Sequence, residues 1–186
     1  MVLDVADFRL HRSLAQSLKK FRADGACEIR VDFDFAGVIS ACSGVARSGQ
    51  DGTWIVPEMQ AAYLALHHAG SAHSIEVWKD GIRIGGLYCV AIGKAVFGES
   101  MFSLQSGASK IALAALVAMC RRGGAARIDC QQNTAHLASL GAREMPRGVF
   151  AQHVAAACLQ APMDWRFEPL YWSELLPSPP LLPTGA

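Results

Sequence analysis

The segment 72–103 constrains the fold most, because two runs of alternating residues in it are separated by a strong turn signal. The dipeptide Asp80-Gly81 lies between these runs, and Asp-Gly in that position is the strongest short-range signal of a β-hairpin. A second turn is indicated at Gly93-Lys94, after which another strand-like run follows. The segment therefore predicts an antiparallel meander of strands.

The residues after the meander predict a helix and one more strand. Residues 104–124 are apolar enough for a buried helix, with Ser106 as its N-terminal cap and Gly123-Gly124 at its end. Residues 125–132 return to a strand-like pattern, and the order strand–helix–strand favours a right-handed crossover. The whole order predicts an α/β fold with a mixed, mainly antiparallel sheet flanked by helices. It is compatible with an acetyltransferase-like (GNAT-type) fold, although topology alone does not fix an activity.

The N-terminal part of the chain predicts further helices around one strand. Its first helix is amphipathic, because Leu10, Leu14 and Leu18 fall on one stripe at helical spacing. The last of these helices has Pro57 in its first turn and Gly70 at its end. The expected elements are a helix at 9–22, a strand at 27–33, a helix at 34–44, a turn-rich loop at 47–53 and a helix at 57–70.

Composition limits the class of protein and its partners. With 52% hydrophobic and 18% charged residues, the chain has the composition of a globular protein and not of a disordered one. Its net charge is only +1, so an anionic partner has to be bound by a local basic patch. The longest apolar run, 111–120, is too short to span a bilayer, and the first residues lack a signal peptide, so we expect a cytoplasmic protein with no membrane partner.

Length and cysteine spacing complete these limits. A chain of 186 residues suits one domain with a short appendage, and we expect a main domain at 1–150 and a C-terminal extension at 151–186. The extension is rich in proline near its end, and its last part is expected to be disordered. The six cysteines form no Cys-x-x-Cys pair and have no histidine at zinc-finger spacing. Reduced thiols and no metal site are therefore expected.

Three polar positions are candidates for chemistry. Asp129 and Gln131 lie in the predicted last strand, where residues two apart point to the same face, so both side chains should emerge together. A carboxylate bound to loop amides and a functional pair fit this pattern equally well. Glu99 ends an apolar strand and is either a solvated carboxylate or a group that binds a cation or transfers a proton. Trp54 is either a platform for a ligand ring or a cover for the core.

The first helix offers a candidate binding face. Arg9, Arg12, Lys19 and Lys20 lie opposite its apolar stripe, and no acidic residue is mixed among them. A solvated surface explains this face, and so does contact with phosphates. The sequence also contains His136, for which no nucleophile is implied as a partner.

Ordered blocks of the chain resemble a known family. The blocks GTWI, AHSIEVW, GGLYCVAIG, FGESMFS, ASKIAL, IDCQ and HLASLGARE occur in this order over about residues 8–150. Together they resemble the bacterial leucyl/phenylalanyl-tRNA–protein transferases, whose usual small N-terminal domain is mostly missing from this chain. The resemblance implies an acetyltransferase-like domain that moves leucine or phenylalanine from aminoacyl-tRNA to the α-amino group of proteins beginning with Arg or Lys, which marks them for degradation. It implies no metal, no other cofactor and no DNA partner.

The resemblance also implies roles for individual residues. Asp129 and Gln131 would orient the attacking amine and help to deprotonate it, and Glu99 would neutralise the cationic acceptor. The basic face of the first helix would contact tRNA. The pocket for the transferred amino acid would be formed by Trp54, Leu87, Val96, Met101 and Ser103.

Two other functions stay open on the sequence. The first is an N-acetyltransferase that uses an acyl-CoA, although the segment LQSGASK does not have the spacing of a pyrophosphate-binding loop. The second is a catalytically weak remnant that binds tRNA or protein, which the missing N-terminal part favours.

Overall fold

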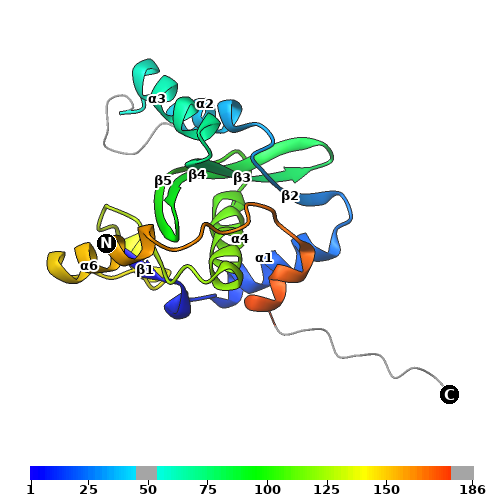
Figure 1. The fold of residues 1–186 in the computed structure, drawn as a ribbon. Coiled ribbons are helices and arrows are strands. Elements are labelled where there is room, and N and C mark those ends of the chain that lie inside the picture. Colours follow the sequence, from blue (N-terminus) through cyan, green and yellow to red (C-terminus); the bar gives the residue numbers. More distant parts are fainter. Residues whose placement is uncertain (45–53, 177–186) are drawn as a thin grey trace.

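The computed structural model describes residues 1–44 and 54–176, and these residues form one sheet with helices on both faces (Figure 1). The strand order in the sheet is β1-β6-β5-β4-β3-β2, and all neighbours are antiparallel except the parallel pair β5 and β6. The expected mixed, mainly antiparallel sheet is therefore confirmed. The strands are β1 (Val2–Asp4), β2 (Cys27–Val31), β3 (Ala72–Lys79), β4 (Ile82–Ile92), β5 (Ala95–Ser103) and β6 (Arg127–Asp129).

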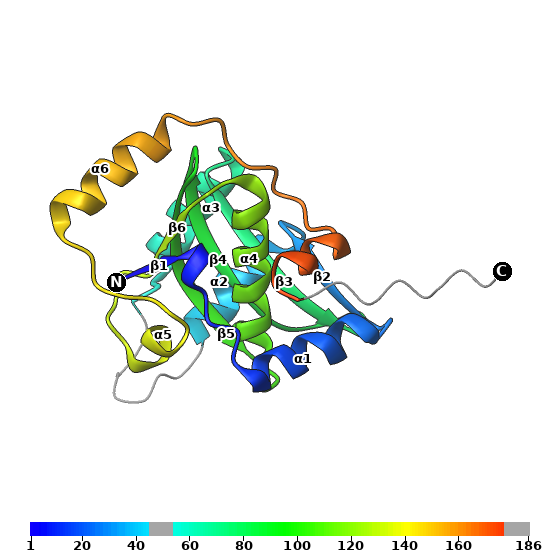
Figure 2. The ribbon, with the colours of Figure 1, turned by 90° about the horizontal axis from the view of Figure 1, so that it is seen from below.

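Helices cover the two faces of the sheet unequally. In Figure 1, α2 and α3 lie on one face, whereas α4 and α1 lie on the other. Figure 2 shows α4 running along the middle of its face, with the start of α1 beside one of its ends. The helices are α1 (Arg12–Ala23), α2 (Phe35–Gly44), α3 (Pro57–His68), α4 (Ala108–Gly123), α5 (Ala135–Ser139) and α6 (Arg147–Cys158), with short 3-10 turns η1 (Val5–Asp7) and η2 (Pro169–Glu174).

The predicted meander is confirmed at both turns. Asp80 and Gly81 have φ angles of 50° and 74°, and Lys79 pairs with Ile82 across the hairpin. A two-residue turn with positive φ at both positions matches the twist of antiparallel strands, which is why Asp-Gly is favoured there. The second turn has Gly93 at φ 58°. Three long strands of the sheet are thus set by local turn chemistry.

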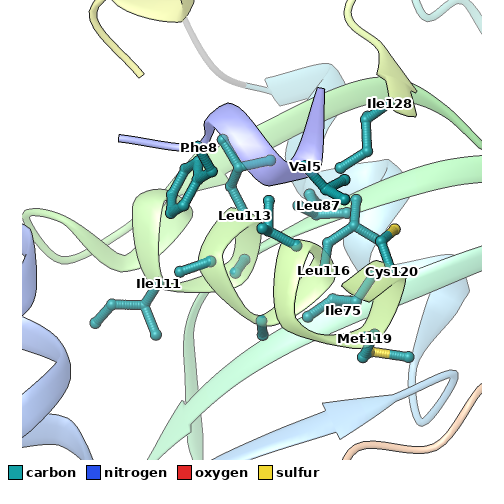
Figure 3. Packing of buried hydrophobic residues seen from close by; sticks show 14 of the residues in the cluster. Val5, Phe8, Ile75, Leu87, Ile111, Leu113, Leu116, Met119, Cys120 and Ile128 are labelled. Atoms are coloured by element: carbon teal, nitrogen blue, oxygen red, sulfur yellow. The ribbon is translucent and has the colours of Figure 1, made fainter. Parts of the chain in front are cut away.

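The buried helix α4 organises the larger hydrophobic core. Leu113, Leu116 and Met119 project from it among side chains of the sheet and of the N-terminal segment, as Figure 3 shows. This helix also makes the crossover that a parallel pair such as β5 and β6 requires. Its start differs from the prediction, because the cap residue is Gly107 at φ 84° and not Ser106. The end was predicted correctly, since Gly124 follows the helix at φ 74°.

Strand β6 is shorter than the sequence predicts. It ends at Asp129, whereas the alternating pattern continues to residue 132. The chain leaves the sheet because Gln131 adopts a φ of 50° and its backbone N–H donates to Asp129 Oδ1 at 3.0 Å. Pairing between β5 and β6 is limited to Val96 with Ile128 and Phe97 with Asp129. Beyond this point β5 has no neighbour in β6, and the sheet opens.

The C-terminal segment packs back on the domain. Met163, Trp172 and Leu176 belong to the same core as α4. The Trp165 ring stacks on His73 with a centroid distance of 3.9 Å. The expected boundary at residue 150 lies inside α6, and the division into two parts stays a prediction. The predicted loop at 47–53 and the proline-rich end at 177–186 lie outside the described residues.

The described residues contain neither a membrane-spanning helix nor a cluster of metal ligands. None of their helices combines the length and the apolar character needed to cross a membrane. Within residues 1–44 and 54–176, no group of three or more His, Cys, Asp or Glu side chains is placed to hold a metal ion.

Candidate active site

A cavity of about 440 Å³ lies where β5 and β6 part. One wall is the C-terminal half of β5, and the other is the segment 130–137 that follows β6. Ligand sites in open α/β sheets commonly lie at such a divergence beyond the carboxyl ends of the strands. The cavity is therefore the candidate active site.

The floor of the cavity is apolar. Its side chains come from β4, β5, β6 and α4, and most of them belong to the larger core. Such a floor accepts an aliphatic or aromatic side chain and excludes water from the groups above it. The floor consists of Leu87, Met101, Leu113, Leu116 and Ile128.

Glu99 is the carboxylate at the cavity wall. Tyr63 Oη donates a hydrogen bond to its Oε2 at 2.8 Å. Burial raises the pKa of Glu99, the bond from Tyr63 lowers it, and the nearby charge of Asp129 raises it. Glu99 is thus partly withdrawn from water, and it is not the solvated strand end that the sequence also allowed.

Tyr63 is a site residue that sequence reasoning missed. It lies on α3, and its ring contacts Tyr88 and Trp54 edge-on, with centroid distances of 5.0 and 6.4 Å. Burial and the bond to Glu99 raise its pKa well above the usual value, so it acts as a hydrogen-bond donor at neutral pH. The expected helix at 57–70 contained the residue, but no local pattern pairs it with a carboxylate far along the chain.

Asp129 and Gln131 border different cavities. Gln131 lines the large cavity, whereas Asp129 borders a small second cavity between β6 and α6. The Oδ1 atom of Asp129 accepts the backbone N–H of Gln131 and thereby holds its left-handed conformation. The two side chains therefore do not share one strand face, because Gln131 has left the strand.

The predicted pocket residues divide into two groups. Trp54, Leu87 and Met101 line the cavity. Val96 is buried lower in β5 beside the small second cavity. Ser103 lies at the end of β5, where its Oγ accepts the backbone N–H of Ser109 at 2.8 Å and supports the start of α4. The structure does not bring Val96 and Ser103 to the cavity.

The far rim of the cavity is an ordered turn of helix. Thr134 Oγ1 accepts the backbone N–H of Leu137 and caps α5. His136 lies on this helix and lines the cavity. Although His136 is largely exposed, partial burial lowers its pKa and the positive charge of Lys110 lowers it further, which favours the neutral ring.

The basic face of α1 is exposed as expected. Leu14, Leu18 and Phe21 are buried in the core, while Lys19 and Lys20 face solvent. Arg12 begins the helix, and Arg9 precedes it. Among the described residues, no carboxylate lies within 4.0 Å of the four cations Arg9, Arg12, Lys19 and Lys20.

The chain is similar to known proteins over most of its length. The family model described as leucyl/phenylalanyl-tRNA protein transferase matches residues 2–155. The leucyl/phenylalanyl-tRNA–protein transferase of Albidiferax ferrireducens is 56% identical over 176 residues, which are 95% of this chain and 69% of that protein. That of Polaromonas sp. gives the same figures, and that of Burkholderia ambifaria is 50% identical over 186 residues, 73% of its length.

The fold, the apolar cavity and these matches define an aminoacyltransferase. The chain belongs to the leucyl/phenylalanyl-tRNA protein transferase family, which uses aminoacyl-tRNA and protein substrates. Among solved structures, an aminoglycoside N-acetyltransferase in complex with CoA aligns with a TM-score of 0.41 and 16% identity, over 74% of this chain and 90% of that chain. A likeness at this level carries no argument about activity, and the family assignment is favoured over the acyl-CoA alternative.

Proposed function

We propose that the chain transfers leucine or phenylalanine from aminoacyl-tRNA to the α-amino group of proteins that begin with Arg or Lys, and so marks them for degradation. The reaction takes place in the cytoplasm, where charged tRNA is made. The observation that carries the proposal is an apolar cavity with a partly buried carboxylate, Glu99, in its wall. The proposal assigns the transfer to residues 1–150 and treats residues 151–186 as an extension.

The apolar floor selects the amino acid that is transferred. A leucine or phenylalanine side chain placed between Met101 and Leu113 removes its apolar surface from water. Full burial of such a side chain contributes roughly 1.5–3 kcal/mol, which polar and charged side chains do not gain. Met101 is unbranched and adapts to both shapes, so one floor serves both amino acids.

Glu99 selects the acceptor. A protein that begins with Arg or Lys brings an α-ammonium group and a cationic side chain to the cavity. The ionised carboxylate of Glu99 attracts both charges at the wall of a mainly apolar cavity. Its bond to Tyr63 fixes the carboxylate in place before the acceptor arrives.

The bond change is an aminolysis. The α-ammonium group has an ordinary pKa of about 8, so it must lose a proton before its nitrogen attacks the ester carbonyl. The new C–N bond forms, the bond between the carbonyl carbon and the ribose oxygen breaks, and the leaving oxygen takes up a proton. We assign the alignment of the amine to the Gln131 side chain and the positioning of Gln131 to Asp129.

One assay tests the proposal. The protein is incubated with labelled leucyl-tRNA or phenylalanyl-tRNA and with a peptide that begins with Arg, and labelled peptide is measured. A peptide that differs only by Glu at its first position is the matched control, and it should receive little label because Glu99 repels it. Equal transfer to both peptides would overturn the assigned role of Glu99. No transfer from either tRNA, with tRNA binding retained, would favour a binding remnant.

A further inference from the structure

The arginine and lysine side chains of residues 1–44 and 54–176 either pair with a carboxylate or do not. Most arginine and lysine side chains on the sheet and the C-terminal part pair with a neighbouring carboxylate, as Arg30 does with Glu28 and Lys79 with Asp24. Among the described residues, no carboxylate lies within 4.0 Å of Lys110. The cations on the basic face of α1 also have no carboxylate within that distance. Cations without internal partners are free to bind phosphates.

Lys110 lies one helical turn before Leu113, a residue of the cavity floor, and residues three apart on a helix share one face. It occupies the first turn of α4, where the helix dipole adds positive potential. Its charge acts on His136, which lines the cavity from α5. Both side chains are exposed, so neither is needed to fill the core.

The rim formed by α5 contacts the start of the basic helix α1. His11 Nε2 lies 2.7 Å from the carbonyl oxygen of Ser139, and the backbone N–H of Arg9 donates to Leu140 O at 2.9 Å. The start of α1 thus lies against the end of α5, three residues from His136. Figure 2 shows this end of α1 beside α4 as well, and Phe8 belongs to the same core cluster as Ile111 and Leu113 of α4. These contacts place the start of α1 next to α5, whose His136 lines the cavity.

We propose that Lys110 and His136 bind the phosphodiester groups next to the terminal nucleotide of the aminoacyl-tRNA, between the cavity that takes the aminoacyl group and the helix α1 that takes the acceptor stem. The inference rests on the proposed function. Lys110 supplies a point charge, and the neutral ring of His136 supplies one N–H donor. The ester must reach the cavity floor, so the last phosphates have to cross this rim.

The test separates the phosphates from the rest of the substrate. Dissociation constants are measured for a CCA trinucleotide, for adenosine without phosphate and for whole leucyl-tRNA, with wild type and Lys110→Gln. We expect Lys110→Gln to weaken binding of the trinucleotide and of the tRNA by about threefold to tenfold at low salt. The slope of the logarithm of the binding constant against the logarithm of the salt concentration should become smaller by about 0.7. Adenosine binding should not change. His136→Gln should also weaken binding of the trinucleotide, but by a smaller factor.

Two variants serve as controls. Lys94 lies at the opposite end of α4, near Gly124, so Lys94→Gln should change none of the three constants. Lys19→Gln on α1 should weaken binding of whole tRNA and leave binding of the trinucleotide unchanged. Equal weakening of adenosine and trinucleotide by Lys110→Gln, or no effect on the trinucleotide, would overturn the inference. Because these constants need no catalysis, a failure of the proposed function would appear separately, as absence of transfer by wild type.

Discussion

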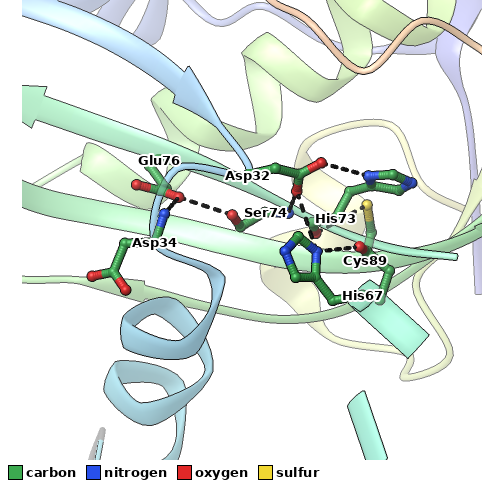
Figure 4. Close-up of polar contacts among 8 residues, drawn as sticks. Asp32, Asp34, His67, His73, Ser74, Glu76 and Cys89 are labelled. Carbon is green, nitrogen blue, oxygen red and sulfur yellow. Dashed lines mark hydrogen bonds and ion pairs between the residues drawn. The ribbon is translucent and has the colours of Figure 1, made fainter. Parts of the chain in front are cut away.

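Glu76 and Glu99 are two acidic residues that the fold withdraws from water in different ways. The carboxylate of Glu76 is fully buried and accepts hydrogen bonds from Asp34 N at 2.7 Å, from Ser74 Oγ at 2.9 Å and from Trp78 Nε1 at 2.9 Å. Figure 4 shows the bonds from Asp34 and Ser74, and the bond from Asp34 joins β3 to the residue before α2. Within the described part of the chain, Glu99 accepts one hydrogen bond, from Tyr63, and it borders the cavity.

We propose that this difference separates a structural carboxylate, Glu76, from a functional one, Glu99. A buried carboxylate with several donors is satisfied by the protein itself and has no capacity left for a ligand. Next to Glu76, Asp32 is satisfied in the same way, since it accepts from Ser74 N at 2.8 Å and lies 2.7 Å from His73 Nδ1. Glu99 keeps acceptor capacity that its surroundings do not use. This spare capacity is what a cationic substrate needs.

The largest expected effect is on folding, at Glu76. Glu76→Ala leaves three donors buried without an acceptor, and we expect it to lower the free energy of unfolding by about 3–5 kcal/mol. Denaturant unfolding followed by circular dichroism measures the change. Glu76→Gln is the matched control: it keeps the shape and one acceptor oxygen, so its loss should be about half as large. A loss below about 1 kcal/mol for Glu76→Ala would break the contrast with Glu99.

The second effect is on catalysis, at Glu99. Glu99→Gln keeps the acceptor oxygen but removes the charge, and we expect kcat/KM for a peptide that begins with Arg to fall about a hundredfold. Transfer assays with labelled leucyl-tRNA measure it. The binding of tRNA should not change, because the proposed tRNA contacts lie elsewhere. An unchanged kcat/KM would remove Glu99 from the mechanism.

Glu99→Gln should raise the free energy of unfolding at neutral pH, whereas Glu76→Ala should lower it. Burial raises the pKa of Glu99, so the folded state favours the protonated form. The contribution of the protonated carboxyl to stability is complete below the unfolded pKa of about 4.3 and is lost as the pH rises through the folded pKa. Glu99→Gln should therefore match wild type at low pH and be the more stable protein at neutral pH. Unfolding curves at two pH values check this.

Local features of this fold could be predicted from the sequence, whereas contacts between distant residues could not. The turn at Asp80-Gly81 and the end of α4 at Gly124 follow from local backbone chemistry, and both were predicted. The contact between Tyr63 and Glu99 joins residues far apart in the chain, and no local pattern encodes it. Candidate residues that act alone are thus visible in a sequence, whereas their supporting partners need the fold.

The end of β6 shows the same limit within a single strand. The alternating pattern through residue 131 fits a continuing strand, and it predicts one face for Asp129 and Gln131. A short turn closed by the Asp129 carboxylate fits the same residues, and it is the turn that forms. Periodicity does not distinguish the two, because the same residues fit both conformations and β5 continues to Ser103 past the last pair with β6.

Asp129 provides the third effect, which tests positioning. Asp129→Ala removes the acceptor that holds Gln131 N–H, and we expect kcat to fall about thirtyfold as Gln131 loses its alignment. Asp129→Asn keeps an acceptor oxygen and should lose only about threefold. Single-turnover transfer measures both. Equal losses for the two variants would mean that the charge of Asp129 matters, and not its hydrogen bond.

The smallest effect is expected at Tyr63 and concerns pH. The bond from Tyr63 lowers the pKa of Glu99 against the opposing effect of burial. Tyr63→Phe removes this bond, so the pKa of Glu99 should rise, and the acid limb of the pH profile of kcat/KM should move to higher pH. Activity above the limb should be nearly unchanged, because Glu99 is ionised there in both proteins. If kcat/KM falls at every pH while the acid limb stays at the same pH, Tyr63 only supports the packing of Trp54.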